Sequence, residues 1–202
     1  LRMIAIIDYG AGNLFSVKNA LDYIGEANTI TDAPEDLRRA DGLILPGVGA
    51  FPDAMRMLKE SGLADAICKE AASGKPILGI CLGMQVLFDR GMEFAETAGL
   101  SLIPGTVERI KTSYKIPHMG YNELIFGVPC PLLEGVEKGD SVYFVHSYMA
   151  NTSDAYIAAT CDYGTAITAL VQNKNVFGAQ FHPEKSGAVG LTILKNFGGL
   201  TR

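Results

Sequence analysis

Cys81 lies in the stretch ILGICLGMQ (77–85), with Gly79 two residues before it and Gly83 two residues after it. An apolar strand, a sharp turn and a helix around G-x-nucleophile-x-G form the nucleophile elbow of hydrolases, here with cysteine in place of serine. The elbow would hold the sulfur above the carboxyl edge of a sheet and at a helix N-terminus, where partial positive charge favours a thiolate. The pattern predicts a nucleophilic cysteine; the alternative is a small buried residue in a tight turn.

A cysteine nucleophile needs a base, and the chain has three histidines, His118, His146 and His182. His182 ends the apolar stretch VFGAQF and is followed by Pro183 and Glu184. We expect His182 to accept the thiol proton and the Glu184 carboxylate to orient the imidazole and stabilise its charged form. A strand-end histidine capped by a nearby acid is the structural alternative. The other two histidines are expected to be structural.

Apolar strand-like runs alternate with segments of helical periodicity in the first half of the chain. Strands that are apolar throughout and are separated by helices predict a parallel sheet covered on both faces. The expected strands are 3–8, 28–31, 42–45 and 75–80, and the expected helices are 14–24, two parts of 53–74 interrupted near Gly62, and one that begins directly after Cys81.

From about residue 100 the pattern becomes β-rich, with strand-like stretches over 106–112, 118–126, 140–150, 155–164 and 166–182. These strands should extend or flank the central sheet, and a last helix is expected near 187–198. No repeat or linker divides the sequence. We therefore predict one α/β domain over residues 1–202, with a mostly parallel central sheet flanked by helices and a β-rich second half.

The composition and charge of the chain argue against several classes of function. The 202 residues are 48% hydrophobic and 19% charged, which is typical of a globular protein. A net charge of −5 without a basic cluster argues against a nucleic-acid partner. Apolar runs are too short to span a membrane, and the first ten residues lack the features of a signal peptide. The cysteine spacings fit no metal motif and no disulfide scaffold. We expect a cytoplasmic protein without a metal.

Two stretches together, GICLGMQ and FHPEKS, resemble the class I (triad) glutamine amidotransferases. Four further stretches are similar to the glutaminase subunits of imidazole glycerol phosphate synthase, an enzyme of histidine biosynthesis. They are IIDYGAGN (6–13), LPGVGAF (45–51), PHMGYN (117–122) and YFVHSY (143–148). The resemblance runs in order from residue 3 to about residue 190, and it implies the class I glutamine amidotransferase fold.

The resemblance implies a reaction in which Cys81 attacks the side-chain amide of glutamine and His182 protonates the departing ammonia. Water then hydrolyses the glutamyl thioester to glutamate. The amide N–H of Leu82 and one from Val48 or Gly49 would form the oxyanion hole. Glycines on both sides of Val48 leave that peptide free to rotate, so we hypothesise that partner binding turns its donor into place. A simple tight turn is the alternative for this stretch.

The resemblance also implies contacts with the substrate glutamine. Gln85 matches a family position beside the substrate, and Glu93 matches an acid that could pair with the α-amino group. Gly47 matches the first residue of the loop that forms the oxyanion hole. Ser147 and Tyr148 match the segment that lines the carboxylate end. Solvated or capping polar residues are the alternative.

The partner implied is a (β/α)8-barrel cyclase subunit, which would dock over the site and form a heterodimer. Ammonia would pass through it, and no metal or organic cofactor is implied. Asn13, Tyr121, Tyr143 and Lys185 would face this partner. Tyr121 stands where the family usually has tryptophan.

Three alternatives remain beside this hypothesis. The chain could be the glutaminase component of another synthase, such as that for anthranilate or pyridoxal phosphate. It could be a non-catalytic interaction subunit, although the intact Cys81, His182 and Glu184 argue against that. A cysteine peptidase or stress protein on a similar elbow often has its histidine directly after the cysteine, where this chain has Leu82.

Overall fold

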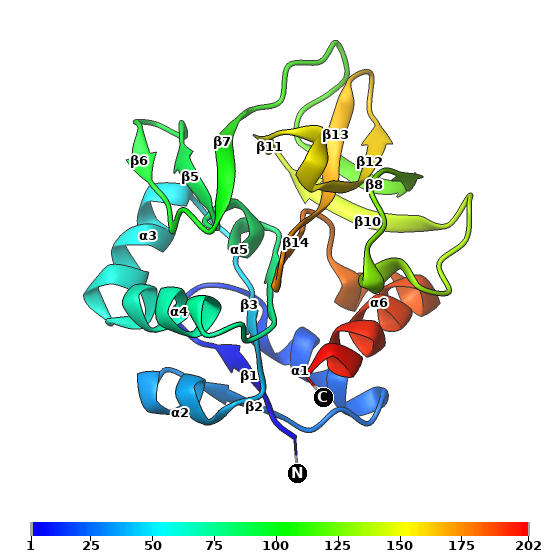
Figure 1. Ribbon diagram of the computed structural model, residues 1–202. Helices are drawn as coiled ribbons and strands as arrows, with labels where there is room; N and C mark the ends of the chain where they lie inside the picture. Colours follow the sequence, from blue (N-terminus) through cyan, green and yellow to red (C-terminus); the bar gives the residue numbers. More distant parts are fainter. Residues whose placement is uncertain (1, 202) are drawn as a thin grey trace.

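The computed structural model describes residues 2–201, and an eight-stranded sheet runs through its centre (Figure 1). Its first five strands in spatial order are parallel, and the last three are antiparallel. The order is β2 (Asn28–Thr31), β1 (Ile4–Ile7), β3 (Gly42–Leu45), β4 (Ile77–Ile80), β14 (Val176–Ala179), β13 (Ala166–Asn173), β12 (Ile157–Asp162) and β9 (Ile125–Phe126). The predicted, mostly parallel central sheet is confirmed.

Helices cover both faces of this sheet because alternate residues of each apolar strand point to opposite sides. On β1, Ile4 and Ile6 pack into one hydrophobic core, while Ala5 and Ile7 pack into the other. The first core includes α1 (Leu14–Tyr23) and α6 (Gly187–Leu200), and the second includes α2 (Pro34–Arg39), α3 (Phe51–Glu60) and α4 (Leu63–Ala72). The interruption predicted near Gly62 separates α3 from α4, and Gly62 has φ +76°, a conformation that favours glycine.

The segment after the elbow differs from the expected helix. Only α5 (Leu82–Gln85) is helical, and β5 (Phe88–Gly91) follows almost at once. Residues 86–88 are buried, and their carbonyls accept hydrogen bonds from residues 100–103, so a second layer of strands ends the helix after one turn. So short a helix supplies local N–H groups, but it lacks the aligned peptides of a full macrodipole.

The β-rich second half both extends and flanks the central sheet, as the sequence predicts. β12, β13 and β9 extend it, and two smaller sheets lie beside it (Figure 1). One pairs β8 (His118–Glu123) with β10 (Ser141–His146), and the other has the order β11 (Tyr148–Asn151), β7 (Ile103–Arg109), β5 and β6 (Thr97–Ala98). Three short 3-10 helices complete the fold: η1 (Pro131–Leu133), η2 (Asp154–Tyr156) and η3 (Pro183–Lys185).

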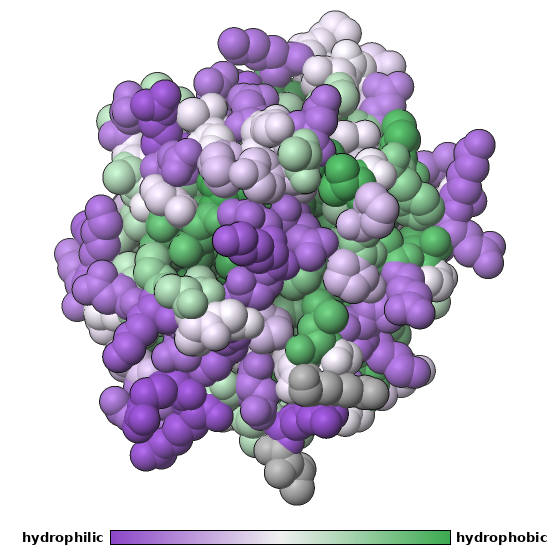
Figure 2. Space-filling view, in the orientation of Figure 1, coloured by the Kyte–Doolittle hydropathy of each residue, from purple (hydrophilic) through white to green (hydrophobic). Residues whose placement is uncertain are grey.

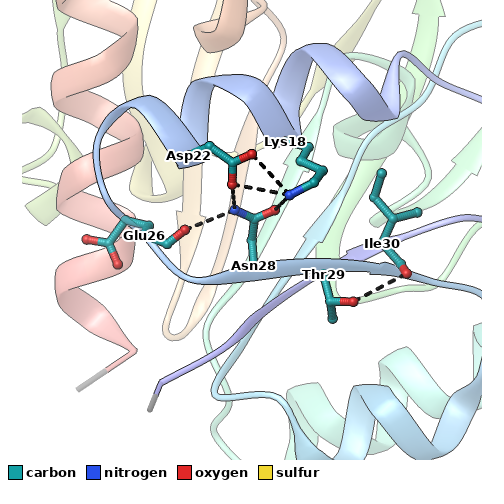
Figure 3. A network of polar contacts seen from close by, with 6 residues as sticks. All are labelled: Lys18, Asp22, Glu26, Asn28, Thr29 and Ile30. Atoms are coloured by element: carbon teal, nitrogen blue, oxygen red, sulfur yellow. Dashed lines mark hydrogen bonds and ion pairs between the residues drawn. The ribbon is translucent and has the colours of Figure 1, made fainter.

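A polar network fixes the turn between α1 and β2 (Figure 3). Asn28 Nδ2 donates to Asp22 Oδ1 at 2.7 Å and to the Glu26 carbonyl at 2.9 Å, and Lys18 Nζ lies 3.1 and 3.2 Å from the two Asp22 oxygens. The hydrogen bond from Asn28, and then that from Lys18, lower the pKa of Asp22. The network joins the C-terminal half of α1 to the first residue of β2.

Figure 2 shows hydrophobic surface in separate patches among hydrophilic side chains on this face of the molecule. Within residues 2–201, no helix has both the length and the apolar character needed to cross a membrane.

Glycine in α6 sets how closely this helix approaches the segment that carries His182. A methyl group on Gly190 would overlap the carbonyl of Pro183. We expect Gly190→Ala to lower the free energy of unfolding by about 1–3 kcal/mol, because overpacking forces the backbones apart. Gly199→Ala in the same helix is the matched control, since no neighbouring atom lies within 4 Å of a methyl group there, and it should not destabilise. Urea denaturation of both variants measures this, and equal midpoints would contradict the expectation.

Candidate active site

The elbow predicted at Cys81 is present. Cys81 directly follows β4 and has φ 54° and ψ −113°, a conformation that costs a non-glycine residue on the order of 1–3 kcal/mol. A Cβ on Gly79 would lie 2.5 Å from the carbonyl oxygen of Gly83, and one on Gly83 would overlap the carbonyl of Leu45. Both glycines are therefore required by close backbone approach around the turn.

The predicted base lies on the neighbouring strand. β14 pairs with β4 in parallel, with Gly178 opposite Gly79 and Ala179 opposite Ile80, so the chain leaves both strands at the same edge of the sheet. His182 follows β14, and its Nδ1 lies 2.8 Å from Oε1 of Glu184. The two side chains are 4% and 2% exposed, so this contact is shielded from water.

The charge state of His182 follows from these neighbours. Burial by itself lowers the pKa of His182, but the Cys81 and Glu184 side chains outweigh it and raise the pKa to about 9. Its Nε2 is buried and has no hydrogen-bond partner within residues 2–201. The imidazole can therefore hold a proton on the side away from Glu184.

A cavity of about 510 Å³ opens at this edge of the sheet. Ten of the residues selected from the sequence line it: Val48, Gly49, Cys81, Leu82, Gln85, Glu93, Ser147, Tyr148, His182 and Lys185. These residues come from five separate segments of the chain. The segments are the loop after β3, the elbow with α5, the loop after β5, the junction of β10 with β11, and the turn from His182 into η3. The cavity has the size and mixed polarity of a small-molecule site.

Three further candidate residues lie around the cavity without lining it. Glu184 lies behind His182, and Gly47 packs so closely on the elbow that a Cβ there would lie 2.9 Å from the Gly83 nitrogen. Asn13 is exposed, and its side chain accepts from Ser16 N at 3.3 Å, which caps α1.

The remaining two candidates form a small aromatic group beside the base. The Tyr121 hydroxyl donates to the Lys185 carbonyl at 2.8 Å, and the rings of Tyr121 and Tyr143 lie 5.4 Å apart. The Tyr143 ring centroid lies 6.5 Å from that of His182. This group links β8 and β10 to η3, the 3-10 helix that carries Glu184.

Glu93 has a second contact that the sequence does not reveal. Its Oε2 accepts from the backbone N–H of Phe51 at 2.8 Å, which is the first residue of α3. One carboxylate oxygen therefore stabilises a helix N-terminus, while the side chain also lines the cavity.

Three residues of the site with polar side chains were not selected from the sequence. Gln180 donates to Cys81 Sγ at 3.8 Å, Arg109 lines the cavity beside Tyr148, and His146 lines it as well. Gln180 precedes His182 by two residues on an extended segment, so strand periodicity could have found it. Arg109 and His146 carry no such local signal.

No group of three or more histidine, cysteine or acidic residues in the described part of the chain is placed to hold a metal ion. The four cysteines are free, with Cys81 and Cys161 buried and Cys68 and Cys130 partly buried.

Comparison with known proteins assigns the family. Residues 5–198 match the profile described as "Glutamine amidotransferase class-I". A Bacillus cereus protein named "Imidazole glycerol phosphate synthase subunit HisH" is 52% identical over 198 residues, covering 98% of this chain and 95% of that protein. The chain belongs to the HisH family of class I glutamine amidotransferases. Relatives of the same name from Bacillus thuringiensis and Bacillus anthracis are 52% and 51% identical, with the same coverage.

Two solved structures share this fold. One described as "Crystal structure of glutamine amidotransferase" matches with a TM-score of 0.76 at 21% identity over 98% of each chain. "Structure of PurLQS from Thermotoga maritima" matches with a TM-score of 0.76 at 22% identity over 97% of each chain. At this identity the likeness shows the fold alone.

Glu184→Gln should lower the pKa of His182, because Nδ1 loses its charged acceptor. In the parent chain the pKa of about 9 exceeds the ordinary value of 6.5. The folded chain therefore keeps a proton that the unfolded chain releases, and the stabilisation from His182 is complete below about pH 6.5 and lost as pH rises through about 9. In Glu184→Gln this stabilisation should be lost at a lower pH than in the parent chain. NMR titration of the His182 ring measures the shift, and an unchanged midpoint would contradict it.

Proposed function

We propose that this chain hydrolyses glutamine to glutamate and ammonia and supplies the ammonia to the cyclase subunit of imidazole glycerol phosphate synthase. The observation that carries the proposal is that Cys81 and His182 line one cavity at the carboxyl ends of two neighbouring parallel strands, with Glu184 bound to His182 from behind. The shared HisH name of relatives about half identical in sequence supports it. Residues 1–202 would form one glutaminase domain in the cytoplasm.

In the proposed mechanism the Cys81 sulfur attacks the side-chain amide carbon of glutamine. His182, protonated on Nε2, gives that proton to the departing ammonia, and Glu184 stabilises the imidazolium that precedes this step. The neutral imidazole then takes a proton from water, which attacks the thioester and releases glutamate. Each step uses the same Nε2 atom, which has no hydrogen-bond partner among residues 2–201.

The oxyanion hole would be formed by backbone N–H groups on two sides of the sulfur. Leu82 N follows the nucleophile directly, and Val48 and Gly49 line the cavity from the loop after β3. Loss of one such donor would raise the barrier by about 3 kcal/mol. A methyl group on Gly49 would meet nothing within 4 Å, which supports a peptide that can rotate when the partner binds.

The substrate would lie along the cavity with its amide at Cys81. The Glu93 carboxylate would attract the α-amino group, while Arg109 and the Ser147–Tyr148 segment would hold the α-carboxylate. Gln85 lies between these ends and the sulfur. Gly47 would position the oxyanion loop against the elbow.

The proposed partner is a (β/α)8-barrel cyclase subunit, which would form a heterodimer over the cavity mouth. Apolar side chains near the site are exposed and would be buried by it: Val48, Met92, Phe94, Met119 and Tyr121. A group of exposed apolar side chains beside a cavity is typical of a docking surface. Asn13, Tyr143 and Lys185 would lie within or beside this interface. Enclosing the ammonia prevents its protonation and loss in water.

The direct test measures glutamate release by the chain alone and with a cyclase subunit and its ribonucleotide ligand. We expect strong stimulation by the liganded partner and loss of activity, by about 10⁴-fold or more, in Cys81→Ala. Complex formation is monitored in parallel by size-exclusion chromatography. No glutamate release from a complex that has formed would refute the proposed function.

The partner interface gives a second prediction. Tyr121→Ala should weaken cyclase binding by about tenfold or more, since exposed aromatic residues are frequent hot spots of interfaces. Tyr121 is 62% exposed, and Tyr23 is 80% exposed at the far end of α1. Tyr23→Ala is therefore a matched control that should bind normally. Titration calorimetry measures the affinity of each variant for the cyclase subunit. Equal affinities of Tyr121→Ala and Tyr23→Ala would show that the interface lies elsewhere.

A further inference from the structure

Gln180 is a buried polar side chain beside the candidate nucleophile that the mechanism above does not use. It is 0% exposed, and its Nε2 lies 3.8 Å from Cys81 Sγ. A buried amide must satisfy both its donors and its acceptor, so its orientation is determined by its neighbours. Those neighbours form a continuous series of hydrogen bonds.

The carbonyl of Tyr148 fixes the orientation of two amides in succession. A carbonyl oxygen only accepts, so the group of Gln85 that lies 3.1 Å away must be Nε2. The same Nε2 lies 3.0 Å from the Gln180 side chain, which must therefore present Oε1 to it. Gln180 is left with Nε2 on the side of the sulfur. The opposite orientation of either amide would bring two acceptors or two donors together.

The Tyr148 carbonyl is itself held from its other side. His146 Nδ1 lies 2.8 Å from this oxygen, so Nδ1 carries a proton. Burial lowers the pKa of His146 to about 4, and its Nε2 lies 2.9 Å from Nδ1 of His118. The His118 ring is stacked between those of Phe144 and Tyr163, with centroids 4.7 and 4.0 Å away. These rings hold the far end of the series in place.

The sulfur has a second polar neighbour whose effect depends on its charge. The carbonyl of Val145 lies 3.9 Å from Sγ and can accept the thiol proton as a hydrogen bond. Once the proton leaves, the thiolate is repelled by the partial negative charge on the carbonyl oxygen. The N–H of Gln180 then becomes a charge-assisted donor to the thiolate, and such bonds are about twice as strong as neutral ones.

We propose that Gln180 is a positioning residue that stabilises the Cys81 thiolate through Nε2, and that His146, the Tyr148 carbonyl and Gln85 aim this donor. The inference rests on the proposed role of Cys81 as nucleophile. It assigns a purpose to two glutamines and a histidine buried next to one another, and it connects strands β8 and β10 to the sulfur.

The test measures how fast iodoacetamide alkylates Cys81 as a function of pH, because only the thiolate reacts. Mass spectrometry follows the peptide that contains Cys81, so the other three cysteines do not interfere. Gln180→Met keeps the side-chain length and removes the donor. We expect its midpoint of alkylation to rise by about one pH unit, a tenfold loss of thiolate at a given pH. An unchanged midpoint would overturn the proposal.

Two further variants separate the donor from a general effect of substitution. Gln180→Glu should raise the midpoint further than Gln180→Met, because a carboxylate repels the thiolate. Gln172→Met on β13, whose amide donates to the Lys174 carbonyl, should leave the midpoint unchanged. Apart from the carboxyl group that Gln180→Glu introduces, the titratable groups around the sulfur are the same in all variants: Tyr9, Glu93, Arg109, His146, His182, Glu184 and Lys185. A shift in Gln172→Met equal to that in Gln180→Met would refute a specific role.

A second measurement needs no change at Gln180, in case its variants do not fold. In the ¹⁵N-labelled chain, the Gln180 side-chain N–H signals should shift over the pH range in which Cys81 becomes reactive, and this shift should disappear in Cys81→Ala. If the Gln180 signals do not shift when Cys81 ionises, the proposal is overturned. Neither readout uses glutamine, so a failed glutaminase assay and a failed positioning role are distinguishable.

Discussion

The backbone turn at Cys81 constrains everything around it. A residue with a side chain is held at φ 54° between two glycines, each of which allows another backbone segment to approach where a methyl group would collide. The loop after β3 can then pass directly against the elbow, which brings Val48 and Gly49 to the same cavity as the sulfur. Strain at the nucleophile is sustained because β4 lies in the centre of the sheet, paired on both sides.

The proposed chemistry depends on neighbours that oppose the effect of burial. An isolated imidazole at the position of His182 would be neutral, yet Cys81 and Glu184 more than offset the cost of its charge. His146 lies nearby without such a carboxylate, and its pKa falls to about 4 instead. Two histidines on one side of one cavity thus have opposite charge preferences, one suited to carrying a proton and one to fixing a carbonyl.

Local patterns predicted most strands, most helices and the three candidate catalytic residues, because apolar runs, glycine turns and a histidine before proline and glutamate are local signals. β5 and β6 were not predicted. The one-turn length of α5 was missed because Leu87 and Phe88 suit either a helix or a strand, and hydrogen bonds from residues 101–103 favour the strand. Gln180 and Arg109 were missed for a related reason: their importance depends on groups far away in the sequence. The insertion of β14 between β4 and β13 likewise has no local signature.

That insertion also bears on how the chain is made. β14 is the last strand of the sequence, yet it occupies the middle of the central sheet, between β4 and β13. Until residue 179 has left the ribosome, both of those strands present unpaired backbone edges, which other chains could pair with. The same delay separates the thiol from its histidine during synthesis. A nascent chain would therefore be prone to aggregation and would lack the assembled site. Insertion of β14 would end both conditions in one step.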